Sequence, residues 1–149
     1  MDAMELRQIS VFCGLDVGKG EHHATALDRD GHRLHDKALP QHEQALRALF
    51  DKLNAHGPVV VVVDQPASIG ALPVAIARSM GVMVAYLPGL AMRRIADLHP
   101  GNAKTDARDA FIIAEAARTM PHALRRVGFD DEVLADLEVI VGFDDDLAG

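Results

Sequence analysis

Hydrophobic and polar residues along the first third of the chain follow a two-residue period that predicts strands. Residues 8–17 are apolar on both faces of that period, which is typical of a strand in the middle of a sheet. A polar turn at 28–31 separates two further short stretches and ends in Gly31, which is free to take a positive φ. The pattern therefore predicts an antiparallel meander of three strands at 8–17, 21–27 and 32–39.

From residue 42 onward, apolar positions recur every three or four residues, a spacing that predicts helices alternating with strands. The five consecutive valines at 59–63 lie between Pro58 and Asp64 and indicate a buried, parallel strand. Pro73 must sit in the first turn of its helix or kink it. The predicted elements are helix 42–55, strand 59–63, helix 67–80, strand 82–87, helix 90–98, helix 106–119 capped by Thr105, and helix 131–147.

Three antiparallel strands followed by β-α-β-α is the element order of an α/β domain with three layers and a five-stranded mixed sheet. The last predicted helix carries an apolar stripe of Val133, Leu137 and Ile140. This stripe needs a partner, in this domain or in a second copy of the chain, so we expect a homo-oligomer, a dimer through this helix. We also expect the chain to be the front part of a longer protein.

Composition places the chain among ordinary soluble proteins. Its 149 residues fit one domain, and 49% hydrophobic with 25% charged residues supply a core that needs no disulfide staples. The single cysteine, Cys13, suits a reducing compartment, and the acidic start of the chain is unlike a secretion signal. The longest aliphatic run, 59–63, is far short of a membrane span. We therefore expect a cytoplasmic protein without membrane partners.

The net charge of −7 is distributed unevenly along the chain. Residues 127–149 hold eight acidic residues and no Lys or Arg, so residues 1–126 carry a net charge of +1. Within 93–126 the balance is seven basic residues against four acidic ones. Because the acidity belongs to the C-terminal segment, the overall charge does not exclude a nucleic-acid partner for the rest of the chain.

Four aspartates stand where the predicted elements would bring carboxylates together. Asp16 lies near the end of the central strand, Asp64 directly follows the valine strand, and Asp106 and Asp109 share one face of a helix. Crowded carboxylates repel one another, and a hard divalent cation such as Mg²⁺ removes that cost. Two such ions about 3.5–4 Å apart stabilise the attacking and leaving oxygens in phosphodiester chemistry. If the four carboxylates meet, they form a two-metal phosphoryl-transfer site.

Each aspartate also has a structural interpretation. Aspartate commonly follows a strand as a turn residue, and Asp106 and Asp109 would complement a helix dipole, which is worth about 0.3–1 kcal/mol each. For any one of these residues taken alone, the structural interpretation is preferred. For the four together, on strand ends and one helix face, the functional interpretation is preferred.

Three segments give the chain a resemblance to a known family: Gly-Leu-Asp-Val-Gly-Lys at 14–19, the valine strand ending at Asp64, and Lys-Thr-Asp-Ala-Arg-Asp-Ala at 104–110. Over most of its length the chain resembles the DEDD transposases, insertion-sequence recombinases with a RuvC-like, RNase H-like N-terminal domain. The resemblance implies that 8–126 form this catalytic domain. It implies that the acidic helix at 127–149 starts a coiled coil leading to a downstream domain with a nucleophilic serine.

The resemblance also implies the ligands and the activity. Asp16, Asp64, Asp106 and Asp109 match the four acidic metal ligands, although the second acid of the family is usually Glu. The implied activity is DNA strand cleavage and transfer at the ends of an insertion element, with two Mg²⁺ or Mn²⁺ ions. DNA is the implied partner, together with a bridge RNA that selects donor and target.

Basic residues in and near these motifs are candidates for holding a nucleic-acid backbone through its phosphates. They are Lys19, Lys104, Arg108, Arg93 and Arg94. For Arg118, Arg125 and Arg126, a solvated helix surface is an interpretation at least as good.

The histidines of the first third of the chain suggest little chemistry. His22 lies where the family often has a histidine, and His23, His32 and His35 follow it on the predicted hairpin. Their alternating spacing is typical of exposed polar positions. No set of His and Cys residues has the spacing of a zinc site.

Two other functions stay open. Gly-x-Asp-x-Gly before a hairpin also resembles the first phosphate loop of sugar kinases and actin-like ATPases, but that interpretation leaves 104–110 unexplained and needs a second domain. The other alternative is a non-catalytic RNase H-like module that dimerises and binds RNA. Loss of metal binding with retained nucleic-acid affinity would favour this module.

Overall fold

A computed structural model describes residues 7–18, 22–39, 41–88 and 106–127. The predicted helices 90–98 and 131–147, and the predicted cap Thr105, lie outside these described residues. Within the described residues, none of the helices combines the length and apolar character that crossing a membrane requires.

Six strands form one mixed sheet in the order β3-β2-β1-β4-β5-β6. β1 pairs antiparallel with β2 and parallel with β4, which confirms the predicted meander and the predicted parallel valine strand. The strands are β1 (Val11–Val17), β2 (His22–Asp28), β3 (Arg33–Leu39), β4 (Val59–Val63), β5 (Met83–Tyr86) and β6 (Arg125–Arg126).

The predicted count of five strands is wrong, because β6 adds a sixth at the edge beside β5. β6 consists of two exposed arginines, so it carries no hydrophobic pattern that a sequence analysis could detect. Backbone hydrogen bonds alone define it: Arg126 pairs with Ala85, and the Val127 N–H donates to Val84 O at 3.0 Å. Such short edge strands are set by tertiary pairing and not by residue preference.

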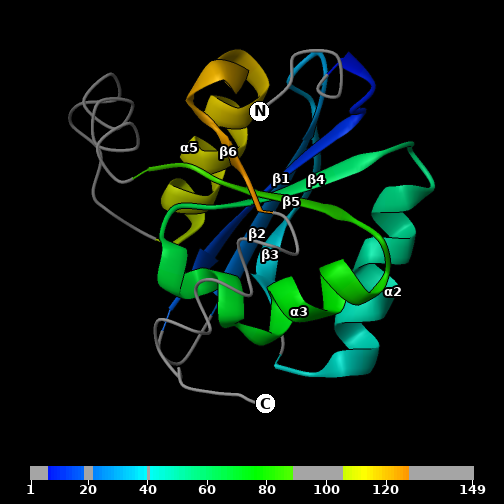
Figure 1. Cartoon of the computed structure of the whole chain (residues 1–149). Helices are drawn as coiled ribbons and strands as arrows, with labels where there is room; N and C mark the ends of the chain where they lie inside the picture. The colour runs from blue at the N-terminus through cyan, green and yellow to red at the C-terminus, as the bar shows by residue number, and fades with distance from the viewer. Residues whose placement is uncertain (1–6, 19–21, 40, 89–105, 128–149) are drawn as a thin grey trace.

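Helices cover both faces of the sheet (Figure 1). The α-helices are α2 (Glu43–Asn54), α3 (Leu72–Ser79) and α5 (Asp106–Thr119), and two 3₁₀ helices are η1 (Pro66–Gly70) and η2 (Pro121–Ala123). The valine strand explains the layers: Val59, Val61 and Val63 pack in the core under α2 and α3, whereas Val60 and Val62 pack in the core under α5. A strand buried on both faces has no polar position to alternate with.

The predicted helix 67–80 is divided into two helices. Pro73 occupies the first turn of α3, where its missing N–H breaks no hydrogen bond of the helix. The residues before it form η1 instead of continuing an α-helix. At the hairpin turn, Gly31 has φ +91°, which confirms the positive φ expected there. Cys13 is a free, fully buried thiol, and its burial raises the pKa to about 12.

Candidate metal centre

Two of the four predicted acids lie side by side at one edge of the sheet. The parallel register pairs Gly14 with Val62. Asp16 stands two residues after Gly14 within β1, and Asp64 stands two residues after Val62, directly after the end of β4. The side chains at positions 12, 60 and 62 pack in the core under α5, so strand alternation places both aspartates on that same face. Both side chains are half-buried.

Gly14 lets α5 approach this face closely. A Cβ atom added at Gly14 would lie 2.3 Å from the Ala110 carbonyl oxygen and 2.6 Å from the Ala114 N atom. Such distances are far inside van der Waals contact, so only a residue without a side chain fits between the strand and the helix backbone. The glycine of the first motif is thus a packing residue, placed two positions before Asp16.

The direction of α5 brings its first turn to the same edge. At the other end of the helix, Arg118 donates to the Arg29 carbonyl oxygen in the β2–β3 turn at 3.4 Å. That turn lies at the amino end of β1, because Asp28 pairs with Val11. The start of α5 therefore points to the carboxyl ends of β1 and β4. Asp109 lies there, half-buried, beside the fully buried Ala110.

The structure thus brings Asp16, Asp64 and Asp109 to one edge from three different elements. Asp106 begins α5 one turn earlier, and its side chain lies outside the described part of the chain. Among the described side chains, Asp16, Asp64 and Asp109 do not form a group whose carboxylate oxygens all lie within 4.8 Å of one another, whereas Asp28, Asp30 and His32 do form such a group. The three described carboxylates therefore share an edge of the sheet without closing around a common point.

The set of Asp28, Asp30 and His32 belongs to the β2–β3 turn. This turn lies at the opposite end of the strands from the candidate metal centre. One oxygen of Asp28 accepts hydrogen bonds from the N–H groups of Asp30 and His32, both at 2.9 Å. Its other oxygen lies 3.1 Å from His32 Nδ1. The backbone hydrogen bond from His32 lowers the pKa of Asp28. Such hydrogen bonds are typical of a turn that closes a hairpin. They explain why Asp28, Asp30 and His32 lie close together.

A partly buried polar network stands next to Asp16 on the α5 face. His23 is the residue directly opposite Asp16 in the antiparallel ladder. Its Nε2 atom lies 2.5 Å from Asp36 Oδ1, which also accepts from the Thr25 hydroxyl at 3.3 Å, while Arg33 Nη1 donates to Asp36 Oδ2 at 2.8 Å. Asp36 therefore ties two strands together beside the candidate centre.

A β-bulge makes this network possible. Arg33 pairs with Leu27 and His35 with Ala26, so Leu34 is an extra residue on β3. In a regular strand, residues three apart face opposite sides, but the extra residue turns Arg33 and Asp36 to the same face. Arg33 then stacks on Phe111 of α5, 4.7 Å from the ring centroid.

We expect Asp36→Asn to lower the free energy of unfolding by about 1–2 kcal/mol at pH 7, because hydrogen bonds to a charged acceptor are lost. Burial alone raises the pKa of Asp36, but the hydrogen bond from His23 and the charges of His23 and Arg33 outweigh it and hold the pKa below its usual value. The stabilisation is thus complete above the unfolded pKa of about 3.9 and is lost as pH falls through the folded pKa.

Urea unfolding of both proteins at several pH values between 7 and 3.5 checks this prediction. The difference in the free energy of unfolding between wild type and Asp36→Asn should become smaller as the pH falls toward 3.5. A gap of equal size at every pH would show that the carboxylate charge contributes nothing to stability.

The expectation that the hairpin histidines are exposed is wrong for His22. Its side chain faces the core under α2, between β1 and β3, and the residue is only 3% exposed. The Gly18 N–H donates to its Nδ1 at 3.1 Å, and its Nε2 lies against the Gln41 amide. The sequence held one signal for this burial: Ala24 and Ala26 follow His22 at a spacing of two, so His22 shares its strand face with apolar residues.

Most predicted phosphate-binding residues lie outside the described side chains. Lys19, Lys104, Arg93 and Arg94 are outside the described residues, and only the backbone of Arg108 is described, as part of α5. Arg118 has a structural role, because its Nε and Nη2 atoms both donate to the Glu115 carboxylate at 2.8 Å. For Arg118, a structural role on the surface of α5 is therefore preferred over phosphate binding.

Comparison with known proteins places the chain in one family. The model of the IS110-type DEDD transposase family, described as a transposase, matches residues 13–149. The chain is 61% identical over 145 residues to the 43.6 kDa protein of insertion element IS110 from Streptomyces coelicolor, covering 97% of this chain and 36% of that protein. It is 31% identical over 140 residues to the 42 kDa protein of IS900 from Mycobacterium paratuberculosis (92% and 35% covered).

A third relative is the 44.8 kDa protein of IS116 from Streptomyces clavuligerus, 33% identical over 115 residues, or 77% of this chain and 29% of that protein. The chain spans about a third of the length of these relatives. The family match covers all three segments that carry the predicted acids, and it begins one residue before Gly14. The chain belongs to the IS110-type family of DEDD transposases.

Proposed function

We propose that this chain is the catalytic domain of a transposase that cleaves and transfers DNA strands at the ends of an insertion element. In this proposal, Asp16 and Asp64 hold divalent metal from the sheet, and Asp106 and Asp109 hold it from α5. The observation that carries the proposal is the common edge: β1 and β4 are adjacent and parallel, Asp16 lies near the end of β1, Asp64 directly follows β4, and α5 starts beside them.

The donor set fits a hard divalent cation. Every proposed ligand is a carboxylate, and Mg²⁺ and Mn²⁺ take oxygen ligands, often keeping water and adding substrate phosphates. An open arrangement of half-buried carboxylates suits ions that complete their coordination with substrate. Asp64 is one methylene shorter than the glutamate usual in the family, and a water molecule or a shift of the loop after β4 accommodates about 1.5 Å.

The proposed chemistry is phosphodiester cleavage and strand transfer. Two bound ions supply activation of the attacking oxygen and stabilisation of the leaving oxygen. The contribution of the chain is to fix the carboxylates on rigid elements, with His23 and its partner Asp36 bracing the strand beside Asp16. Lys19, Lys104, Arg108, Arg93 and Arg94 hold the DNA backbone near the ions. The six-stranded mixed sheet is compatible with an RNase H-like domain.

The wider assembly is also part of this proposal. A bridge RNA selects the DNA sites, and the acidic segment 127–149 pairs two copies through Val133, Leu137 and Ile140. A serine-bearing domain, reached through the coiled coil that this segment starts, completes recombination. Light scattering over a range of protein concentrations tests the pairing, since a mass that stays monomeric throughout would contradict it.

Calorimetric titration of the chain with Mn²⁺ at pH 7 tests the metal site. We compare the wild type with Asp16→Asn. The matched control is Asp30→Asn, which removes one acid from the β2–β3 turn at the opposite end of the strands. Asp16→Asn should weaken binding at least tenfold, whereas Asp30→Asn should bind as the wild type does. Full binding by Asp16→Asn, or loss only in Asp30→Asn, would contradict the proposed site.

A further inference from the structure

A concave site lies on the other face of the sheet, between the edge strand β3 and helix α2. It is a cavity of about 290 Å³. His35, Lys37 and Leu39 reach it from β3, and they pair with Ala26, Ala24 and His22 of β2, whose side chains face away from α5. The cavity is thus separated from the candidate metal centre by the sheet itself.

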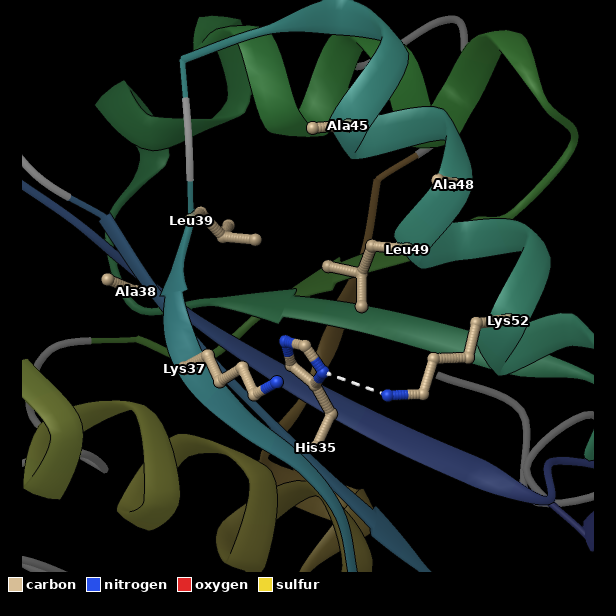
Figure 2. A pocket seen from close by; sticks show the side chains of 8 residues that line it. All are labelled: His35, Lys37, Ala38, Leu39, Ala45, Ala48, Leu49 and Lys52. Atoms are coloured by element: carbon tan, nitrogen blue, oxygen red, sulfur yellow. Dashed lines mark hydrogen bonds between the residues drawn. The ribbon is translucent and has the colours of Figure 1, made fainter.

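Two lysines converge on one imidazole in this cavity (Figure 2). Lys37 comes from β3 and Lys52 from α2, and the Lys52 ammonium group donates to His35 Nδ1 at 3.5 Å. Burial, followed by the charges of Lys52 and Lys37, lowers the pKa of His35. A neutral ring that accepts at Nδ1 carries its proton on Nε2, so a third donor is available beside the two ammonium groups.

The positive charge of this cavity is not balanced by its surroundings. Elsewhere in the described part of the chain, arginines pair with carboxylates: Arg33 with Asp36, Arg47 with Glu43, and Arg118 with Glu115. Lys37 and Lys52 form no ion pair with a described residue, and no acidic side chain lines the cavity. Two ammonium groups that face the same imidazole repel each other, and an anion beside them reduces that repulsion.

The remaining walls are apolar. Leu39 from β3 and Leu49 from α2 supply apolar surface, and Ala45 and Ala48 lie above them on α2 (Figure 2). A ligand that fits must therefore carry an anionic group next to a less polar body. The volume of about 290 Å³ lies just below the range of about 300–1,000 Å³ for small-ligand sites, which suits one nucleotide unit and not a duplex.

We propose that this cavity binds a phosphate group of a single-stranded nucleic acid, with the sugar or base of the same nucleotide against the Leu39–Leu49 wall. The two lysines neutralise the phosphate, and the His35 Nε2–H group donates to it. Because the cavity lies across the sheet from the candidate metal centre, the strand bound here is a second strand and not the one being cleaved. The inference uses the proposed function only for the presence of nucleic acid.

The test is fluorescence anisotropy of labelled twelve-nucleotide oligo(U) and oligo(dT) with the chain, from about 20 to 200 mM salt and in EDTA. EDTA removes divalent metal, so binding measured in its presence does not depend on the proposed metal centre. A failure of the proposed function and a failure of this phosphate site can therefore be told apart. Lys37→Ala/Lys52→Ala should weaken binding at least tenfold at low salt. Each lost phosphate contact lowers the log–log salt slope by about 0.7 for single strands.

Two matched variants separate a built site from surface charge. Arg125→Ala/Arg126→Ala removes the same charge from the opposite edge of the sheet and should cause a smaller loss. Ala48→Trp fills the cavity without changing charge and should weaken binding; intact unfolding curves show that each variant folds. Binding to both oligonucleotides identifies the phosphate as the recognised group, and binding to oligo(U) alone adds a contact to the 2′-hydroxyl.

Three results would overturn the proposal. The first is no binding of either oligonucleotide by the wild type, and the second is an equal loss in the two double-alanine variants. The third is tighter binding of a poly-glutamate peptide than of either oligonucleotide, which would assign the cavity to an acidic protein segment instead.

Discussion

Excision of an insertion element should fall at least a hundredfold when Asp16→Asn is introduced into a transposase carrying this chain. The assay uses a chimera in which the chain replaces the matching segment of its 61% identical Streptomyces coelicolor relative. Asparagine keeps the size of the side chain but removes the charge that holds the metal ion. Because bound ions stabilise both oxygens of the displacement, losing one ligand acts on the transition state directly.

The chimera with the unchanged chain sets the reference rate of excision. Asp30→Asn is the control, because it removes an acid from the β2–β3 turn, away from the proposed ligands. It should excise at the reference rate. Circular dichroism should give the same spectrum for all three proteins, and excision by Asp16→Asn at the reference rate would contradict the assignment.

Gly14→Ala should destabilise the domain by about 3 kcal/mol, at the upper end of the usual cost of overpacking. The new methyl group would meet the backbone of α5 at Ala110 and Ala114, and backbone atoms cannot rotate away as side chains do. The helix must therefore move off β1, taking Asp109 with it. Urea unfolding measures the loss of stability, and Mn²⁺ titration measures the coupled loss of metal affinity.

Gly70→Ala is the matched control, since an added Cβ there has no neighbour within 4 Å and the residue has no positive φ. It should leave both the unfolding midpoint and the metal affinity unchanged. An unchanged midpoint for Gly14→Ala would mean that α5 does not rest on β1 as described.

Elements with strong local patterns could be predicted from the sequence, and those set by distant contacts could not. Five valines in a row have one good structural solution, and β4 has the predicted bounds Val59–Val63. Helix 106–119 also agrees with α5. By contrast, β6 exists only because β5 offers its edge, and the division between η1 and α3 depends on how Pro73 enters the fold.

The candidate site shows the same division. The four aspartates could be proposed as metal ligands because each lies in a motif and also at the end of a predicted strand or in the first turn of a predicted helix, and this assignment stays a prediction. The roles of Gly14 and His22 could not, because the first depends on a helix almost a hundred residues away and the second on its burial between neighbouring strands. The network around Asp36 also required a bulge, which no local pattern in β3 reveals.

The two outer strands of the sheet, β3 and β6, affect how copies of this domain can associate. An unpaired strand edge invites another chain to add to it, and proteins prevent this with short strands, charges and bulges. Both outer strands carry such features: β6 is two residues long and both are arginine, while β3 has a bulge and the exposed Lys37. Copies of the domain should therefore remain separate in crowded solution and should not polymerise into a continuous sheet, which leaves association to surfaces outside its hydrogen-bonded edges.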